Sequence, residues 1–166
     1  QLLRAYFCAR EIGTYYIDST QVEKSSTASR YNLVDNGDFN YDNYAWTLSP
    51  NAGSDNQRVV APQLSKAPQL DNYAYQMQGN PQGELYIYQD VAVSGNAGDT
   101  FVLAGWAKGD SAPLTEAERS FCIRGVFTYE NGETGIFDFS FNPDADSSVN
   151  WQYAAGTMIA AEAYTK

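Results

Sequence analysis

Apolar and polar residues alternate along most of this chain, as in 14-TYYIDSTQVE-23 and 134-TGIFDFSFN-142. A period of two is typical of β-strands, whose successive side chains point to opposite faces, whereas an amphipathic helix has a period of 3.6. Strands are predicted at residues 2–10, 14–23, 58–62, 74–79, 84–93, 100–109, 120–130, 134–142 and 151–162. About nine short strands require two packed sheets. The pattern therefore predicts an all-β fold, a two-sheet antiparallel β-sandwich.

Turn signals separate these runs. In 130-ENGE-133, Asn131 and Gly132 stand where a two-residue hairpin needs positive φ, and 95-GNAGD-99 is a second strong turn. Only 113-PLTEAERS-120 resembles a helix, with Thr115 as its cap, and one helical turn is expected there.

Length and charge limit the classes of function. A chain of 166 residues is the size of one domain. With 20 acidic residues, 10 basic residues and no histidine, its formal charge is −10, which would repel a phosphate backbone. No long apolar run is present. We therefore expect neither nucleic-acid binding nor membrane insertion.

The chemically reactive residues give little support for catalysis. Without histidine, a serine or cysteine nucleophile lacks its commonest base, and an ordinary zinc set is absent. Carboxylates that could serve a glycosidase are present, but nothing in the sequence pairs them: Glu84, Glu130, Glu133 and Asp138. Cys8 and Cys122 each lie in an apolar run and are either one disulfide or two buried thiols. No enzyme is expected.

Four segments, taken together and in this order, carry a family resemblance: 31-YNLVDNGDF-39, Trp46, 86-YIYQDVAVSGNAGDTFVLAGWAKGDS-111 and 150-NWQYAAGTMIA-160. They resemble the jelly-roll modules of bacterial surface and wall-associated proteins, relatives of the carbohydrate-binding modules that begin NL(I/V)xNGDFE. The resemblance implies a jelly-roll β-sandwich that is secreted or displayed at the cell surface. It also implies a noncatalytic function, with a glycan or cell-wall polysaccharide as the partner.

The two closing strands of that family would follow residue 166, but their pattern is found at the other end of the chain. The segment 2-LLRAYFCAREIGTYYIDSTQVEK-24 resembles the family's closing strands. We therefore expect a rotated frame, meaning that the segments follow the family's order after a circular shift. Residues 1–24 close a sandwich, residues 25–30 are a linker and residues 31–166 form the main module. The alternative is that residues 1–24 are an unrelated hairpin.

A rotated frame has two consequences. It predicts that Gln1 and Lys166 lie close together, in one chain or between consecutive chains. It also leaves open whether residues 1–24 complete their own sandwich or a neighbouring one. Completion of a neighbour would make the protein a structural subunit, assembled head to tail into a surface fibre or tandem array by strand complementation. A third alternative is that the chain is one segment of a longer array.

Aromatic side chains on an exposed sheet face can stack on sugar rings. Tyr86 and Tyr88 alternate with apolar residues and therefore face away from them, which makes these tyrosines candidate ligand-binding residues. Gln89 and Tyr75 could add hydrogen bonds. The alternative for all four is an ordinary polar and aromatic solvent face. The resemblance implies that three other aromatic residues are buried in the core: Trp46, Trp106 and Trp151.

A structural calcium ion often ties the NGDF start to the closing strand in the resembled family. Carried over, this implies a site formed by Asp18, Asn36 and Asp38. The sequence departs from the family pattern at Asn40 and Ser19, where charged donors are replaced. The alternative is that Asn36, Gly37 and Asp38 form a tight turn and that Asp18 accepts backbone hydrogen bonds.

Overall fold

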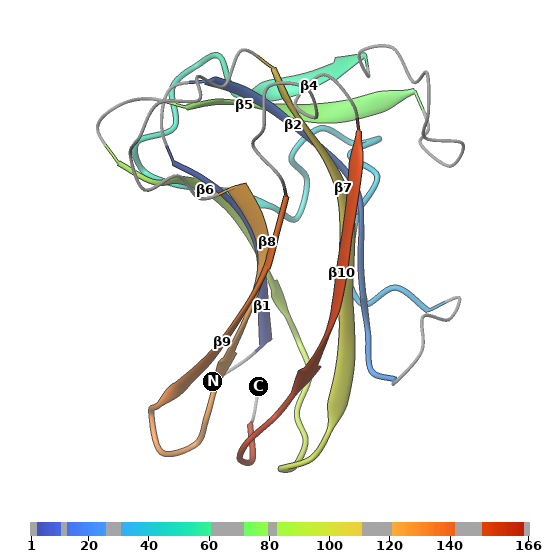
Figure 1. Ribbon diagram of the computed structural model, residues 1–166, viewed down its shortest axis with the longest axis vertical. Coiled ribbons are helices and arrows are strands. Elements are labelled where there is room, and N and C mark those ends of the chain that lie inside the picture. The colour runs from blue at the N-terminus through green and yellow to red at the C-terminus, as the bar shows by residue number, and fades with distance from the viewer. Residues whose placement is uncertain are drawn as a thin grey trace.

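The computed structural model describes residues 3–10, 13–25, 31–60, 72–79, 83–110, 121–141 and 151–164. Two antiparallel five-stranded sheets pack against each other (Figure 1). Sheet A contains, in spatial order, β3 (Thr47–Leu48), β6 (Leu85–Val91), β1 (Leu3–Ala9), β8 (Phe121–Thr128) and β9 (Thr134–Ser140). Sheet B contains β10 (Gln152–Ile159), β7 (Thr100–Asp110), β2 (Gly13–Glu23), β5 (Tyr73–Gly79) and β4 (Gln57–Val60).

The predicted all-β sandwich is confirmed. Among the described residues, nine of the ten strands begin and end within three residues of a predicted strand, and β3, which has only two residues, was not predicted. Within the described ranges there is no helix, and so none that is long and apolar enough to span a membrane. The segment 113–120, where a helical turn was predicted, lies outside the described residues.

The first two strands occupy the middle of the two sheets. β1 pairs with β6 on one side and with β8 on the other, so that Phe7 lies opposite both Ile87 and Ile123. β2 pairs in the same way with β5 and β7. Residues of the predicted closing segment are thus strands paired with the second half of the sequence, and in this structure the paired strands belong to one chain.

The predicted proximity of Gln1 and Lys166 concerns residues outside the described part, as do most residues of the proposed linker. The described ends nevertheless share a neighbour. Leu3 lies opposite Phe127 in the β1–β8 ladder, and the ring centroid of Tyr164 is 5.3 Å from that of Phe127.

The core between the sheets is aromatic. Phe7 stacks on Phe141 with ring centroids 6.3 Å apart, and Trp46 is 5% exposed beside Phe39. Trp46 is therefore a core residue, as predicted. Two further interior rings are those of Phe101 and Phe127, at 5.5 Å.

Trp151 is buried, as predicted, whereas the prediction that Trp106 is a buried core residue is wrong. Trp151 and Ala74 form a separate buried pair, against which Trp106 packs while only half-buried. The Trp106 ring lies 5.2 Å from that of Tyr153, which is 53% exposed. These residues therefore lie on the outer face of sheet B, which the sequence pattern could not distinguish from the inner face.

The β8–β9 hairpin differs in one detail from the prediction. The Tyr129 N–H donates to the Glu133 carbonyl at 2.9 Å, which leaves a loop of three residues instead of two. Gly132 has a φ of +88°, whereas Asn131 is not among the residues with positive φ. A three-residue loop of this kind needs the left-handed conformation only at its last residue, which explains the difference.

Cys8 and Cys122 lie directly opposite each other in the β1–β8 ladder. Both are buried and are free thiols in this structure. The pKa of Cys8 is raised by its contact with the Cys122 thiol and by burial. Of the two alternatives for the cysteines, the structure contains the pair of buried thiols.

Candidate functional site

The outer face of sheet A carries three half-exposed tyrosines in mutual contact. Tyr88 lies opposite Tyr6 in the β1–β6 ladder, and their ring centroids are 5.4 Å apart. The Tyr86 ring lies 5.8 Å from Tyr6 and 6.1 Å from Tyr88. Three adjoining rings on one sheet face offer a continuous aromatic surface of the kind that stacks on a flat apolar ligand.

Arg4 extends this surface at one end. Its guanidinium carbon lies 4.0 Å from the centre of the Tyr88 ring, a cation–π arrangement, and its Nη1 donates to the Tyr6 hydroxyl at 3.2 Å. Its Nε and Nη2 donate to the Asp90 carboxylate, with an Nη2–Oδ2 distance of 2.8 Å. The Asp90 hydrogen bonds raise the pKa of Arg4, and the fixed guanidinium holds the Tyr88 ring in place.

Arg124 occupies the other end of the tyrosine row. The β1–β8 register places it opposite Tyr6, and the β8–β9 register places it opposite Asp138. Its Nη2 donates to Asp138 Oδ2 at 2.9 Å, and its Nη1 to Glu84 Oε1 at 3.3 Å. Tyr6, Tyr86 and Tyr88, together with the two arginines, form what we term the tyrosine face.

Two of the four predicted ligand residues belong to this face. Tyr86 and Tyr88 point outward and are half-buried. Leu85, which precedes them, and Ile87, which lies between them, are fully buried. The alternation that predicted their orientation is therefore correct. Ligand binding by Tyr86 and Tyr88 stays a prediction.

Gln89 does not join the tyrosine face, because its position in β6 turns its side chain to the inner side. It is 5% exposed. Its Oε1 accepts the Asp35 N–H at 2.7 Å, and its Nε2 donates to the Asp35 carbonyl at 2.9 Å. The predicted role of adding hydrogen bonds to a ligand beside Tyr86 and Tyr88 is thus corrected: Gln89 anchors the segment that follows the linker.

Tyr75 also lies elsewhere. It belongs to β5 in sheet B, is 1% exposed, and its ring centroid is 5.5 Å from that of Phe39. Burial raises the pKa of its hydroxyl to about 12. Tyr75 is therefore not placed to add hydrogen bonds to a ligand beside Tyr86, as was predicted, because the two side chains belong to different sheets and Tyr75 packs in the core.

Sequence reasoning missed Tyr6 and both arginines. The outward orientation of Arg4 and Tyr6 could have been inferred from the alternation in 3-LRAYF-7, where both fall between apolar residues. Their place beside Tyr88 could not, because nothing in the sequence specifies that β1 lies between β6 and β8.

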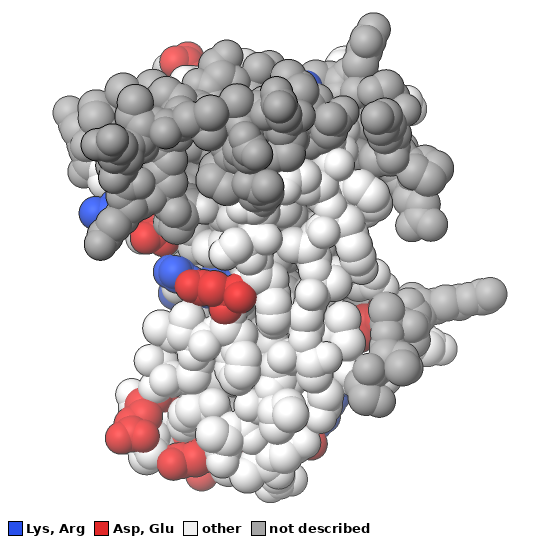
Figure 2. Space-filling view, viewed as in Figure 1, with Lys and Arg blue, Asp and Glu red and all other residues white. Residues whose placement is uncertain are grey.

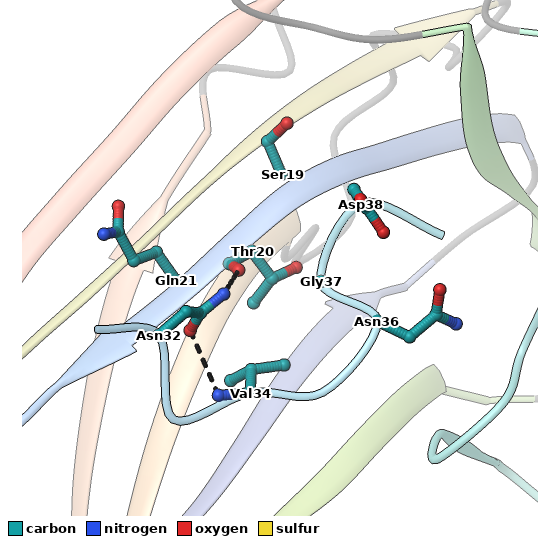
Figure 3. A pocket seen from close by; sticks show the side chains of 8 residues that line it. All are labelled: Ser19, Thr20, Gln21, Asn32, Val34, Asn36, Gly37 and Asp38. Carbon is teal, nitrogen blue, oxygen red and sulfur yellow. Dashed lines mark hydrogen bonds between the residues drawn. The ribbon is translucent and has the colours of Figure 1, made fainter. Parts of the chain in front are cut away.

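The predicted metal corner forms where β2 is interrupted. A bulge between Asp18 and Gln21 shifts the β2–β7 register, and Ser19 there has a φ of +49°. Beside this bulge is a hollow of about 360 Å³ lined by Ser19, Thr20, Gln21, Asn32, Val34, Asn36, Gly37 and Asp38 (Figure 3).

Asn32 fixes the NLVDNGDF segment to the bulge. Its Nδ2 donates to the Thr20 carbonyl at 2.7 Å, and its Oδ1 accepts the N–H groups of Val22 at 2.9 Å and Val34 at 3.0 Å. The Gly37 carbonyl accepts the Thr20 N–H at 2.8 Å, and a Cβ at Gly37 would lie only 2.3 Å from the Thr20 carbonyl oxygen. Glycine is therefore required for this close approach.

The three predicted metal ligands do not converge. The Asn36 side chain bonds its own loop through Asp42, Tyr44 and Tyr41, and Figure 3 shows it pointing away from Asp38. Asp38 accepts a hydrogen bond from Asn40 Nδ2 at 2.8 Å. Asp18 is fully buried, and its Oδ1 accepts the Ser19 N–H at 2.6 Å.

These donors fall short of the six to eight oxygens that calcium takes. In the described part of the chain, no three His, Cys, Asp or Glu side chains are grouped so as to hold a metal ion. One observation does suit a cation: the Thr20 hydroxyl is buried beside the hollow and has no hydrogen-bond partner among the described residues. A structural calcium ion involving Asp18, Asn36 or Asp38 stays a prediction.

Comparison with known protein families, with characterised proteins and with solved structures gives no match for this chain.

Proposed function

We propose that this chain is a noncatalytic glycan-binding module whose ligand lies on the tyrosine face of sheet A. The observation that carries the proposal is the contact between the rings of Tyr6, Tyr86 and Tyr88 on an outer sheet face. Tyrosine offers an apolar ring for the C–H face of a sugar and a hydroxyl for its oxygens.

The charges beside the rings favour a neutral sugar. Both arginines of the face are already engaged by carboxylates: Arg4 by Asp90, and Arg124 by Asp138 and Glu84. An anionic sugar would have to displace these carboxylates, whereas a neutral sugar can accept hydrogen bonds from guanidinium groups that are already oriented. On the side of the sandwich that Figure 2 shows, where β9 and β10 lie, the described surface is largely uncharged, with basic and acidic atoms side by side near its middle.

Two carboxylates that could serve hydrolysis, Glu84 and Asp138, both bond to Arg124. This pairing favours a role in holding the arginine over a role as a general acid. The family resemblance adds that such modules are secreted or displayed on bacterial surfaces, and we extend this location to the present chain as part of the proposal.

Binding of neutral hexasaccharides to the full chain, measured by calorimetry, tests the proposal. Tyr88→Ala should weaken binding by about 1–3 kcal/mol, the loss of one stacked ring at a binding hot spot, and Tyr88→Phe should retain most of the affinity. Tyr31→Ala is the matched control, because Tyr31 is 82% exposed and lies outside the tyrosine face. Equal affinities for wild type and Tyr88→Ala would reject the site.

The alternative function is head-to-tail assembly by strand complementation. The described pairing of β1 and β2 within one chain favours the binding module over this alternative. Sedimentation of the purified chain separates the two, because a module stays monomeric whereas a complementing subunit forms open chains that grow with concentration.

A further inference from the structure

A second aromatic surface lies on the loop before β3. Tyr41 is 75% exposed and Tyr44 is 68% exposed, and the two rings line a hollow of about 350 Å³. The other aromatic residues of this loop, Phe39 and Trp46, are buried in the core. Two aromatic side chains of the loop therefore attach it to the core, and the other two are exposed to solvent.

A turn sets the two exposed tyrosines side by side. The Tyr44 N–H donates to the Tyr41 carbonyl at 3.2 Å, which closes a β-turn and keeps their Cα atoms within about 7 Å. Both side chains are mostly exposed, and both border the hollow.

The backbone that carries these rings is held rigidly by Asn36. Its Oδ1 accepts the Tyr41 N–H at 3.0 Å, and its Nδ2 donates to the carbonyls of Asp42 at 2.9 Å and Tyr44 at 3.1 Å. The Asn36 carbonyl in turn accepts the indole N–H of the buried Trp46 at 3.1 Å. The exposed rings are thus tied to the core through one amide side chain.

Four residues of the loop adopt the left-handed conformation without being glycine: Asn36 at φ +51°, Phe39 at +53°, Asp42 at +58° and Ala45 at +67°. Such conformations are unfavourable for side chains other than glycine, most of all for a bulky one, and they cluster at ligand sites. The unfavourable backbone gives a preorganised surface, which lowers the entropy lost when a ligand binds.

The loop crosses one side of the sandwich. It leads into Thr47, which lies opposite Tyr88 at the edge of sheet A. Asp42 Oδ1 accepts the N–H of Arg58, a residue of β4 at the edge of sheet B, at 3.1 Å. The loop that carries the two exposed tyrosines therefore links an edge of sheet A to an edge of sheet B, and only Ala45 and Trp46 separate Tyr44 from Thr47.

From these observations we propose that Tyr41 and Tyr44 form a second sugar-binding platform, which stacks on a pyranose ring of a neutral glycan. A hollow of this volume is at the small end of ligand sites. Asp35, Asp38 and Asp42 accompany the tyrosines in the sequence and disfavour anionic ligands such as phosphates or uronic acids. The platform binds independently of the tyrosine face.

Chemical shifts of ¹⁵N-labelled full-length chain, titrated with cellohexaose, xylohexaose, laminarihexaose and mannohexaose, test this proposal. The amides of residues 41–45 should shift saturably with at least one hexasaccharide, and equally in wild type and in Tyr88→Ala. The double variant Tyr41→Ala/Tyr44→Ala should lose about ten-fold or more in affinity at these amides. The corresponding double phenylalanine variant keeps the rings and should bind, and Tyr31→Ala is the control for an exposed tyrosine elsewhere.

Three results would overturn the platform, and they separate it from the proposed function. Shifts confined to β1 and β6 would leave the tyrosine face as the sole site. Shifts at residues 41–45 that grow with protein concentration in the absence of sugar would identify a contact between copies of the chain. A titration without any shift would reject both sugar sites.

Discussion

Truncation of Phe7 to alanine should cost about 3–5 kcal/mol of unfolding free energy. The ring is fully buried in β1, stacks on Phe141 and reaches across to sheet B, where a Cβ at Gly105 would lie 2.8 Å from its Cζ. Alanine would leave a cavity between the two sheets. With a urea dependence of about 2 kcal/mol per M, the unfolding midpoint should fall by about 2 M.

The same urea titration also tests whether β1 belongs to its own sandwich. Completion within one chain makes the midpoint independent of protein concentration. Completion by a neighbouring copy would instead add about 2.7 kcal/mol of apparent stability for a hundred-fold rise in concentration. Tyr31→Ala, which removes an exposed ring, should stay within about 0.5 kcal/mol of wild type. A concentration-dependent midpoint, or an unchanged midpoint for Phe7→Ala, would contradict the pairing described for β1.

Four further predictions concern stability and chemistry. Asn32→Ala removes three hydrogen bonds to backbone groups and should destabilise the chain to urea by about 3 kcal/mol. The pKa of Asp99 is lowered to about 2, first by its bond to Lys24. The ionised form is thus favoured by folding, and the stability difference between wild type and Asp99→Asn should persist above about pH 4 and vanish toward pH 2. If calcium binds at the predicted metal corner through Asp38, a chelator should lower the melting temperature of wild type but not of Asp38→Asn. Both thiols should react with a thiol reagent only after unfolding, because both are buried.

Each of these has a result that would reject it. Asn96→Ala is the matched control for Asn32, because its side chain is exposed, and an equal loss in the two variants would remove Asn32 from its anchoring role. A stability difference at Asp99 that persists at pH 2 would contradict its ionic pairing. An unchanged melting temperature with chelator would favour the hydrogen-bonded turn, and the absence of thiols after unfolding would reveal a Cys8–Cys122 disulfide.

The fold class and most strand positions could be predicted because alternation is a local property of the chain. The pairing partners of the strands, and the face of each strand that points into the core, could not be predicted. Which face is the inner one depends on where the opposite sheet lies. Trp106 illustrates this limit: it alternates with buried residues as a core side chain would, yet it lies on the outer face of sheet B. The strand β3 was missed because two residues are too few to show a period.

The candidate site could be predicted only in part for the same reason. Orientation along a single strand correctly placed Tyr86 and Tyr88 outward. Tyr6 joins them through strand pairing, and Tyr75 is separated from them through its place in the other sheet. The presentation of Tyr41 and Tyr44 depends on backbone conformations that non-glycine residues seldom adopt, so no residue preference indicated it.

The central position of β1 and β2 has a consequence for the order in which the protein folds. During synthesis, residues 3–23 emerge before the strands that pair with them, and the partners of β1 end only at Val91 and Thr128. At about 5–20 residues per second, the middle strand of each sheet waits roughly 5 to 20 s for its last neighbour. Contacts between such distant parts of the sequence also close slowly. The newly made chain therefore exposes two apolar strands with free edges until most of it has been translated, and this interval is when it is most open to capture by chaperones or by another copy of itself.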